Sequence, residues 1–326
     1  MRKNNTKLPI GVLIPTRNAM AYLEQHLKGL QSWLHRVEEI IIVDSESTDG
    51  TLEYLSENLH HPSLRIMQHP PGLYESWNFG IQQITAQWLY IATVGDRINA
   101  ACLEKLLTAS KDSHSDVTIS PPSIISPSGK ALKMAWPIHT LLERYKIKHS
   151  RPITNEEAFF WNSLFLPGSL MGSSASNLYL TRYMQENPFE SSYGHAGDIA
   201  WGINHSFSAK WAIVPDCYSE FIEHPSGIIV DKNEKREIKK RLILLARQQL
   251  QDSAGGLSST SSIKLLEDYL QISIDALQNK TDMKALIDKQ TKFYHPALLH
   301  QFIQQKLLSR KISAYRQQLL NRLSIK

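Results

Sequence analysis

Cysteines and long apolar runs are scarce in this sequence. Its 326 residues include two cysteines, Cys102 and Cys217, which are too few for a disulfide framework and favour a reducing compartment. No apolar run approaches the roughly 20 residues that a helix needs to cross a bilayer. The opening MRKNNTKLPIG is charged but lacks the apolar segment of a signal peptide. We therefore expect a cytoplasmic protein.

Several common site motifs are also missing. No Gly-x-Gly-x-x-Gly follows the first apolar run, so a dinucleotide oxidoreductase is unsupported. The Gly-x-x-x-x-Gly-Lys-Ser/Thr phosphate loop is absent, and two cysteines cannot form a zinc cluster. The stretch VDSESTDG (43–50) has alternating oxygen-bearing side chains but lacks the remaining ligands of a calcium loop.

Acidic residues are missing from the end of the chain. Lys and Arg outnumber Asp and Glu by 36 to 31, a net charge of +5, and no acid follows Asp288. That tail combines basic residues with apolar ones near helical spacing: Leu298, Phe302, Leu308, Ile312, Tyr315, Leu319 and Leu323. A basic amphipathic helix can lie on anionic lipid, which would give peripheral contact with the inner face of the cell membrane. The alternative is a helical bundle that packs on the rest of the chain or self-associates. Few aromatic residues are present for base stacking, so no nucleic acid is expected as a partner.

Apolar runs alternate with helical patterns through the first part of the chain. The strand-like runs are 8–15, 38–44, 64–68, 88–93 and 116–120. A segment of helical periodicity lies between each run and the next. This alternation predicts an α/β fold with a mostly parallel sheet flanked by helices. The pattern weakens over 121–172, and the chain becomes helical from about residue 231.

Polar residues follow three of these strands. They are Pro15 to Asn18, Asp44 to Asp49 and Thr93 to Arg97. In open α/β sheets, ligands bind outside the carboxyl ends of the strands. We therefore expect the three clusters to converge on one crevice.

The same runs resemble the nucleotide-sugar-binding half of a family 2 glycosyltransferase. VLIPTRN (12–18), VEEIIIVDSESTDGT (37–51), GLYESWNFGI (72–81) and WLYIATVGD (88–96) follow the family's order and spacing. FESSYGHAGDIAWGINHSFSAKWAIVP (189–215) resembles its acceptor-side segment. The resemblance covers roughly residues 8 to 225.

The resemblance implies a GT-A (Rossmann-like) fold and a domain plan. The catalytic domain would span residues 1–228, with the nucleotide-sugar half at about 8–120 and the acceptor half at about 121–228. Residues 229–326 would form a helical C-terminal extension. The implied activity is inverting transfer of a sugar from a nucleoside-diphosphate donor, UDP-linked, to a hydroxyl of a glycan or lipid-linked acceptor in surface polysaccharide assembly.

By resemblance, the donor side comprises Pro15, Thr16, Arg17, Asp44, Glu46, Tyr74, Asn78 and Asp96. A carboxylate such as Asp44 can accept a hydrogen bond from the imide N–H of a uracil ring; the alternative is that it only caps a turn. The family's second Asp is Ser45 here and its glycine is Glu46, so Glu46 is a substitute base reader. Arg17 stands where the family often has an aromatic residue, and its guanidinium can stack on the base or meet phosphate.

Asp96 is the implied metal ligand. A leaving diphosphate needs its growing charge neutralised, and Mg²⁺ or Mn²⁺ held by oxygens does this. The family's paired acid is reduced here to Gly95 and Asp96; the alternative is that Asp96 only ends a turn. His224 resembles a histidine that touches the diphosphate or the metal, and a structural histidine is equally compatible.

Asp198 is the implied general base, which takes the proton of the acceptor hydroxyl as the new bond forms. The family often places Glu before this Asp, whereas this chain has Gly197. A helix N-cap is the alternative role. The departures at Gly95 and Gly197 also leave open a catalytically inactive GT-A-like protein that serves as a binding or assembly subunit.

Overall fold

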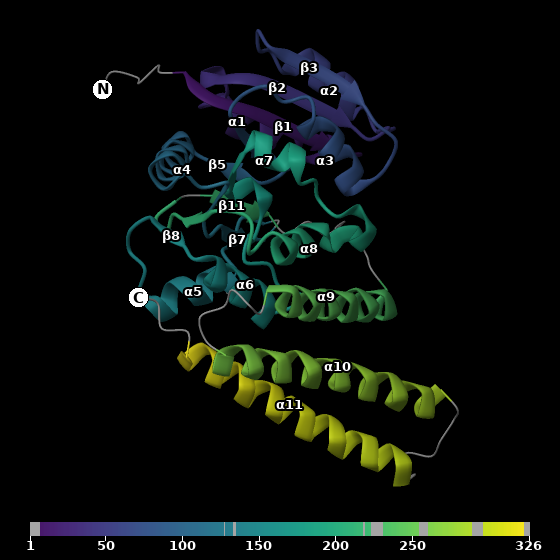
Figure 1. Cartoon of the computed structure of the whole chain (residues 1–326). Coiled ribbons are helices and arrows are strands. Elements are labelled where there is room, and N and C mark those ends of the chain that lie inside the picture. Colours follow the sequence, from purple (N-terminus) through teal and green to yellow (C-terminus); the bar gives the residue numbers. More distant parts are fainter. Residues whose placement is uncertain are drawn as a thin grey trace. The chain divides into compact units, whose positions relative to one another are not determined.

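The computed structural model describes residues 7–126, 128–132, 135–217, 219–222, 231–253, 260–288 and 296–322. The chain divides into two compact units (Figure 1). The first, Met1–Asn162 with Gly168–Ile229, contains both strands and helices, and the second, Ser163–Pro167 with Val230–Lys326, is helical. The predicted α/β class and the C-terminal helical extension are confirmed.

A sheet of eight strands forms the centre of the first unit. In spatial order the strands are β3 (Leu64–Gln68), β2 (Val37–Asp44), β1 (Leu8–Thr16), β4 (Trp88–Ile91), β9 (Leu178–Leu180), β6 (Val117–Ile119), β10 (Trp211–Ile213) and β8 (Arg151–Ile153). The block from β3 to β4 is parallel, as is the pair β6 and β10. Strand β9 runs antiparallel to β4 and β6, and β8 runs antiparallel to β10. The parallel block brings the carboxyl ends of β1, β2 and β4 to one edge.

Three short strands form a second sheet, which the sequence did not predict. They are β5 (Arg97–Ile98), β11 (Ser219–Ile222) and β7 (Ser123–Ile125). Strands this short show no usable alternation of apolar and polar residues. Because β5 begins directly after Asp96, its pairing with β11 fixes the segment that carries this carboxylate.

The helices up to residue 204 are, in chain order, α1 (Met20–Gln31), α2 (Thr51–Asn58), α3 (Leu73–Ile81), α4 (Ala100–Ser113), α5 (Pro137–Tyr145), α6 (Asn155–Leu164), α7 (Thr181–Glu186) and α8 (Gly197–Asn204). Short 3₁₀ turns cover Leu34–Arg36, Ser174–Ser176 and Ser191–Ala196. The sequence predicted α1 to α4 within a few residues of these bounds but missed α6. Its consecutive residues Ala158, Phe159, Phe160 and Trp161 are all fully buried, so the helix has no exposed polar face opposite an apolar one and lacks an amphipathic period.

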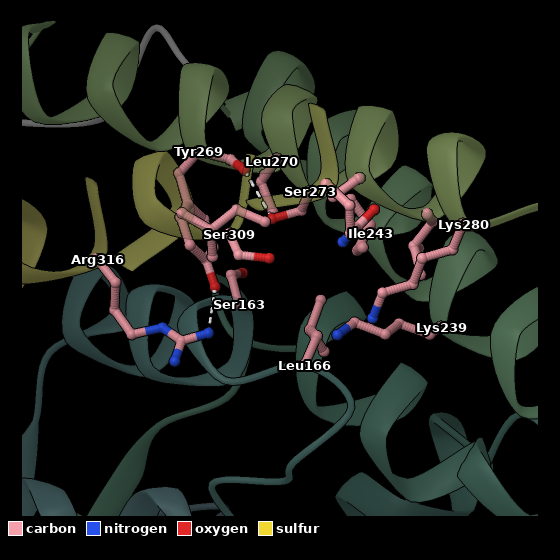
Figure 2. A pocket seen from close by; sticks show the side chains of 14 residues that line it. Ser163, Leu166, Lys239, Ile243, Tyr269, Leu270, Ser273, Lys280, Ser309 and Arg316 are labelled. Atoms are coloured by element: carbon pink, nitrogen blue, oxygen red, sulfur yellow. Dashed lines mark hydrogen bonds between the residues drawn. The ribbon is translucent and has the colours of Figure 1, made fainter. Parts of the chain in front are cut away.

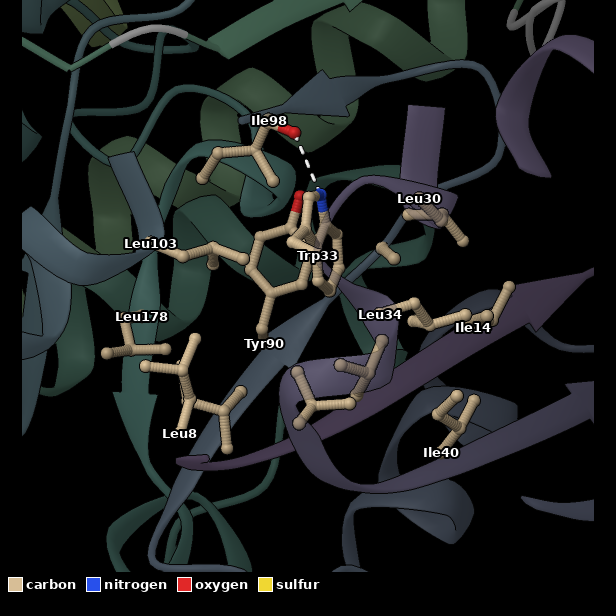
Figure 3. Close-up of a cluster of buried hydrophobic side chains, with 14 of the residues drawn as sticks. Leu8, Ile14, Leu30, Trp33, Leu34, Ile40, Tyr90, Ile98, Leu103 and Leu178 are labelled. Carbon is tan, nitrogen blue, oxygen red and sulfur yellow. Dashed lines mark hydrogen bonds between the residues drawn. The ribbon is translucent and has the colours of Figure 1, made fainter. Parts of the chain in front are cut away.

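Alternate residues of β1 face opposite sides of the sheet. Leu8, Val12 and Ile14 join residues of α1 and α4 in one buried cluster (Figure 3). In this cluster the Trp33 indole N–H donates to the Ile98 carbonyl at 3.0 Å. Each fully buried aliphatic side chain contributes about 1.5–3 kcal/mol, so the cluster holds β1 firmly behind the loop that follows it.

Helix α3 packs closely on the sheet through Gly80. A Cβ placed there would lie 2.8 Å from Val43 Cγ2 and closer still to Leu13 Cδ1. Any larger residue would therefore push α3 away from the strands. Gly80, the second glycine of the motif GLYESWNFGI, thus allows α3 to pack at a short distance from β1 and β2.

The second unit contains α9 (Lys232–Ser253), α10 (Thr260–Asp288) and α11 (Pro296–Arg322), and α10 packs along both of the others. On α11, Leu298 and Leu319 are buried, whereas Phe302 and Ile303 are 49% exposed. The predicted apolar stripe is therefore partly used for packing within the bundle. Membrane contact or self-association through the exposed part stays a prediction. None of the helices in the described ranges is long and apolar enough to span a membrane.

The two cysteines meet in the first unit. A disulfide joins Cys102 to Cys217, whose Cα atoms lie 4.9 Å apart. One disulfide is not a framework, and the cytoplasmic location stays a prediction.

Candidate active site

Loops at the carboxyl ends of β1, β2 and β4 surround one cavity of about 580 Å³. Its lining residues are Pro15, Thr16, Arg17, Asn18, Ala19, Tyr22, Ser45, Gly72, Leu73, Ser76, Trp77, Thr93 and Val94. All three polar clusters contribute, so the predicted convergence on one crevice is confirmed. The start of α3 adds a further wall through Gly72, Leu73, Ser76 and Trp77, whereas the predicted donor residues Tyr74 and Asn78 of the same segment are not among these lining residues. The volume lies within the range of pockets for cofactor-sized ligands.

Asp44 is fully buried at the end of β2. Its Oδ1 accepts hydrogen bonds from the Thr16 hydroxyl at 3.0 Å and the Ser47 hydroxyl at 2.6 Å, and its Oδ2 accepts one from the Ser47 N–H at 2.9 Å. Thr16 and the adjacent Ser45 line the cavity directly. Asp44 therefore orders the loops after β1 and β2, and this placement is compatible with either of its predicted roles.

Asn18 and Asp49 tie the same two loops together. The Thr48 N–H donates to Asn18 Oδ1 at 2.9 Å. Asp49 accepts from the Met20 N–H at 3.0 Å and from the Thr51 N–H at 3.1 Å, so one carboxylate serves the first residues of both α1 and α2. These contacts hold the cavity walls in one arrangement.

Arg17 and Glu46 are both exposed, but only Arg17 lines the cavity. Glu46 has a φ of 54°, the left-handed conformation that favours glycine. Glycine is the residue that the resemblance places at this position. The backbone shape of the family's loop is therefore kept, and the Glu46 side chain lies outside the cavity lining.

Asp96 is 4% exposed and lies two residues beyond the cavity residue Val94. Burial raises the pKa of Asp96 to about 7, although hydrogen bonds from the Ile222 N–H at 3.0 Å and the Ser173 hydroxyl at 2.8 Å oppose the shift. A buried carboxylate with neutral donors and a raised pKa is stabilised by a nearby cation. No local pattern indicates that Ser173, 77 residues away, positions this carboxylate.

The neighbours of Asp96 explain its reduced motif. Gly95 has a φ of 101°, a conformation in which any side chain is strained, so the turn itself disfavours a second acid. Arg97, the next residue after Asp96, forms an ion pair with Glu220 at 3.4 Å. Glycine at position 95 is therefore compatible with the backbone of this turn.

Asp198 lies in the first turn of α8 and is partly exposed. Burial raises the pKa of Asp198 to about 6, opposed by hydrogen bonds from the Tyr74 hydroxyl and the Ile199 N–H. A Cβ at Gly197 would lie 2.5 Å from Tyr74 Cδ2 and would also clash with the Glu190 carbonyl. The Tyr74 ring thus occupies the space of a side chain at position 197, which explains why glycine precedes Asp198.

Asn78 connects α3 to the segment that leads to Asp198. Its Nδ2 donates to the Phe189 carbonyl at 2.9 Å, and its Oδ1 accepts from the Phe189 N–H at 2.9 Å. Tyr74 and Phe189 also stack, with ring centroids 5.3 Å apart. Helix α3 therefore connects the cavity wall to the segment that carries Asp198. The predicted contact of Asn78 with the donor stays a prediction.

No cluster of three or more His, Cys, Asp or Glu side chains suited to a metal ion occurs in the described part of the chain. His224, predicted as a second metal ligand, lies outside the described residues. A single carboxylate still fits Mg²⁺ or Mn²⁺, because such ions commonly use one or two carboxylates with substrate phosphates and waters. Asp96 matches this pattern, since each of its oxygens accepts one hydrogen bond and retains a further lone pair.

Residues 11–170 match the model of glycosyl transferase family 2. The lipopolysaccharide core biosynthesis glycosyltransferase LpsC of Rhizobium meliloti (strain 1021) is 32% identical over 111 residues, which are 32% of this chain and 40% of LpsC. The match thus spans well under half of that relative's length.

Solved structures of S. aureus TarS share the fold of almost the whole chain. The complex of TarS 1–349 with UDP-GlcNAc has a TM-score of 0.58 at 14% identity, covering 96% of this chain and 91% of that one. The complex with UDP has a TM-score of 0.55 at 17% identity, covering 95% and 92%. The fold is therefore that of GT-A glycosyltransferases, including the helical unit. The match over residues 11–170, just under half of the chain, is to glycosyl transferase family 2.

Proposed function

We propose that this family 2 glycosyltransferase moves a sugar from a UDP-linked donor to a hydroxyl of a glycan or lipid-linked acceptor, with inversion at the anomeric carbon. The observation that carries the proposal is the 580 Å³ cavity at the carboxyl ends of the parallel strands. Its size suits a nucleotide sugar. The TarS relatives bind UDP and UDP-GlcNAc, and the name of LpsC supports a setting in surface polysaccharide assembly.

The donor would be held by the loops after β1 and β2. Asp44, held in place by the Thr16 hydroxyl and the Ser47 N–H, would accept a hydrogen bond from the imide N–H of the uracil ring. Arg17, exposed at the cavity rim, presents a planar cation to the base or the diphosphate. Thr16 sets the orientation of Asp44 from the cavity wall.

The diphosphate would lie beside Asp96. A divalent cation bound by this carboxylate and by the phosphates would neutralise the charge that develops on the leaving group. Ser173 and the Ile222 N–H fix the orientation of the Asp96 carboxylate. Burial excludes water from it, which strengthens its attraction for any cation.

Asp198 would act as the general base. The acceptor oxygen forms a bond to the anomeric carbon while the bond to the diphosphate oxygen breaks, and the hydroxyl proton moves to the Asp198 carboxylate. A pKa of about 6 leaves Asp198 mostly ionised at neutral pH yet basic enough to accept a proton. Tyr74 positions the carboxylate and excludes solvent from one side.

An inactive assembly subunit receives no support from the two glycines that suggested it. The positive φ of the turn is compatible with glycine at position 95, and the closeness of the Tyr74 ring accounts for glycine at position 197. Calorimetry with UDP and Mn²⁺ tests the enzyme directly. We expect donor binding that falls in Asp96→Ala, and an Asp198→Ala variant that binds donor normally but does not transfer. Wild-type protein that ignores every nucleoside diphosphate would contradict the proposal.

A further inference from the structure

The helical unit contains a cavity of its own, of about 90 Å³ (Figure 2). Its walls come from the end of α6, the loop after it, and helices α9, α10 and α11. All of its lining residues belong to the second unit. The volume is less than a fifth of that of the donor cavity, so it can hold a small polar group but not a nucleotide sugar.

Three cations line this cavity. Lys239 comes from α9, Lys280 from α10 and Arg316 from α11, and no Asp or Glu is among the described residues that line the cavity. None of the three takes part in an ion pair of the described residues. Figure 2 shows the two lysine side chains converging, with the Arg316 guanidinium held on Tyr269. Three like charges in one small space repel one another unless an anion joins them.

The electrostatics of Lys239 agree with this geometry. Burial lowers the pKa of Lys239, and the charges of Lys280 and Arg316 lower it further. The folded protein therefore holds this ammonium group in an unfavourable place. A bound anion would reverse that effect.

Two buried polar groups at the cavity also lack partners. Ser163 is fully buried, and its hydroxyl has no hydrogen-bond partner in the structure. Arg316 Nε is likewise buried and unpartnered. Buried donors are satisfied in nearly all folded proteins, so two of them at one charged cavity point to a ligand with several acceptor oxygens.

Arg316 is held in place before any ligand arrives. Its Nη2 donates to the Tyr269 hydroxyl at 3.0 Å, and that hydroxyl donates to the Leu164 carbonyl at 2.5 Å. The guanidinium also lies over the Phe165 ring, 5.2 Å from its centroid. An arginine fixed in this way loses little entropy when it binds an oxyanion.

We propose that this cavity binds a phosphate group, with Lys239, Lys280 and Arg316 supplying positive charge and Ser163 donating a hydrogen bond. A group with more than one negative charge matches three cations better than a single carboxylate does, and the small volume admits the phosphate while its carrier stays outside. The carrier is either a soluble phosphate ester or a phospholipid headgroup. This site is separate from the donor cavity and does not depend on the transfer proposed above.

The first test is calorimetric titration of the full-length protein with glycerol phosphate at constant ionic strength set by chloride. We expect saturable binding that Lys239→Met weakens by about tenfold or more, since it removes a charge-assisted contact. Lys235→Met, on an exposed position of the same helix and outside the cavity lining, is the matched control and should bind normally. Equal losses in both variants, or no binding above the chloride background in any titration, would overturn the site.

The thermal stability of the phosphate-free variants provides a second, independent readout. Because Lys239 is held among like charges, Lys239→Met should melt at the same or a higher temperature than wild type in chloride buffer, and should lose the upward shift that phosphate gives the wild type. A variant that melts lower and still shows the full phosphate shift would refute the role of Lys239.

The carrier is identified by co-sedimentation with phosphatidylglycerol vesicles, using phosphatidylcholine vesicles as the reference. Binding to phosphatidylglycerol that drops in Lys239→Met but not in Lys235→Met assigns the site to a lipid headgroup. Glycerol phosphate binding without any such vesicle difference assigns it to a soluble ester. Both results support the phosphate site.

Discussion

Buried carboxylates at the two ends of the parallel sheet have pKa values that are shifted in opposite directions. At the amino end of β2, Glu39 accepts hydrogen bonds from the Thr85 and Ala86 N–H groups at 2.6 and 2.7 Å and pairs with Arg65 at 2.7 Å. At the carboxyl end, the donors to Asp96 among the described residues are two neutral groups, the Ser173 hydroxyl and the Ile222 N–H. Burial alone would raise both pKa values, but the donors around Glu39 outweigh it and lower the pKa of Glu39, whereas the pKa of Asp96 rises to about 7.

The difference separates structural acids from reactive ones. The ionised Glu39 stabilises the folded protein at pH values above the usual pKa of a Glu side chain. This contribution is lost as the pH falls through the lowered pKa that Glu39 has in the folded state. Asp96 and Asp198 have raised pKa values, so the folded state binds more protons than the unfolded chain between about pH 4 and pH 7, and their contribution to stability falls as pH rises through that window. The negative charges of Asp96 and Asp198 lower the stability of the folded protein, and these charges are available to interact with a ligand.

The largest expected effect is on turnover when Asp198 is changed. Asp198→Asn keeps the shape of the side chain but cannot accept the acceptor proton, so kcat should fall by about 10²–10⁴-fold. Donor affinity, measured by calorimetry, should stay within about twofold of wild type. A kcat of Asp198→Asn within tenfold of the wild-type value would show that Asp198 is not the general base.

The next effect concerns metal-dependent donor binding. Asp96→Asn should weaken UDP binding in Mn²⁺ by about tenfold or more and abolish the difference between Mn²⁺ and EDTA. Because the carboxylate is unfavourably buried, the variant should not melt lower than wild type at pH 8. A Mn²⁺ effect on UDP binding that survives in Asp96→Asn would show that other ligands hold the ion.

Changing the acid at the opposite end should affect folding instead. Glu39→Gln leaves buried N–H donors and Arg65 poorly paired, and we expect a loss of about 2–3 kcal/mol in the free energy of unfolding. Denaturant titration measures this loss. Turnover per folded molecule should be unchanged, and a loss of kcat without a loss of stability would erase the contrast between the two ends.

The smallest effect is a shift in a pH profile. The Tyr74 hydroxyl lowers the pKa of Asp198, so Tyr74→Phe should move the acidic limb of kcat/KM, centred near pH 6 in the wild type, upward by about half to one pH unit. The ring that packs on Gly197 is retained, so melting temperature serves as the control. An unmoved or lowered limb would show that Tyr74 does not act on Asp198.

Much of the fold of the first unit was predictable because it depends on patterns of neighbouring residues in the sequence. The apolar runs at β1, β2 and β4 end at polar loops, and parallel strands must bring those loops to one edge. The crevice and its neighbour Asp96 followed from that rule, and Asp198 followed from resemblance to a family motif.

Other features depend on distant parts of the chain and left no local pattern. Ser173 reaches Asp96 across 77 residues, and the reason for Gly197 is a ring on α3. The phosphate cavity draws on α6, α9, α10 and α11, so Lys239 and Arg316 look in the sequence like ordinary basic residues of a helix surface. Only the packing shows that they share one space.

The most direct test of the central claim is a calorimetric titration of the full-length protein with UDP in Mn²⁺, run in parallel on Asp198→Asn and Asp96→Asn. Our account predicts saturable binding by wild type and Asp198→Asn with similar affinity, and clearly weaker binding by Asp96→Asn. Absence of UDP binding in the wild type, or identical binding by all three proteins, would contradict it.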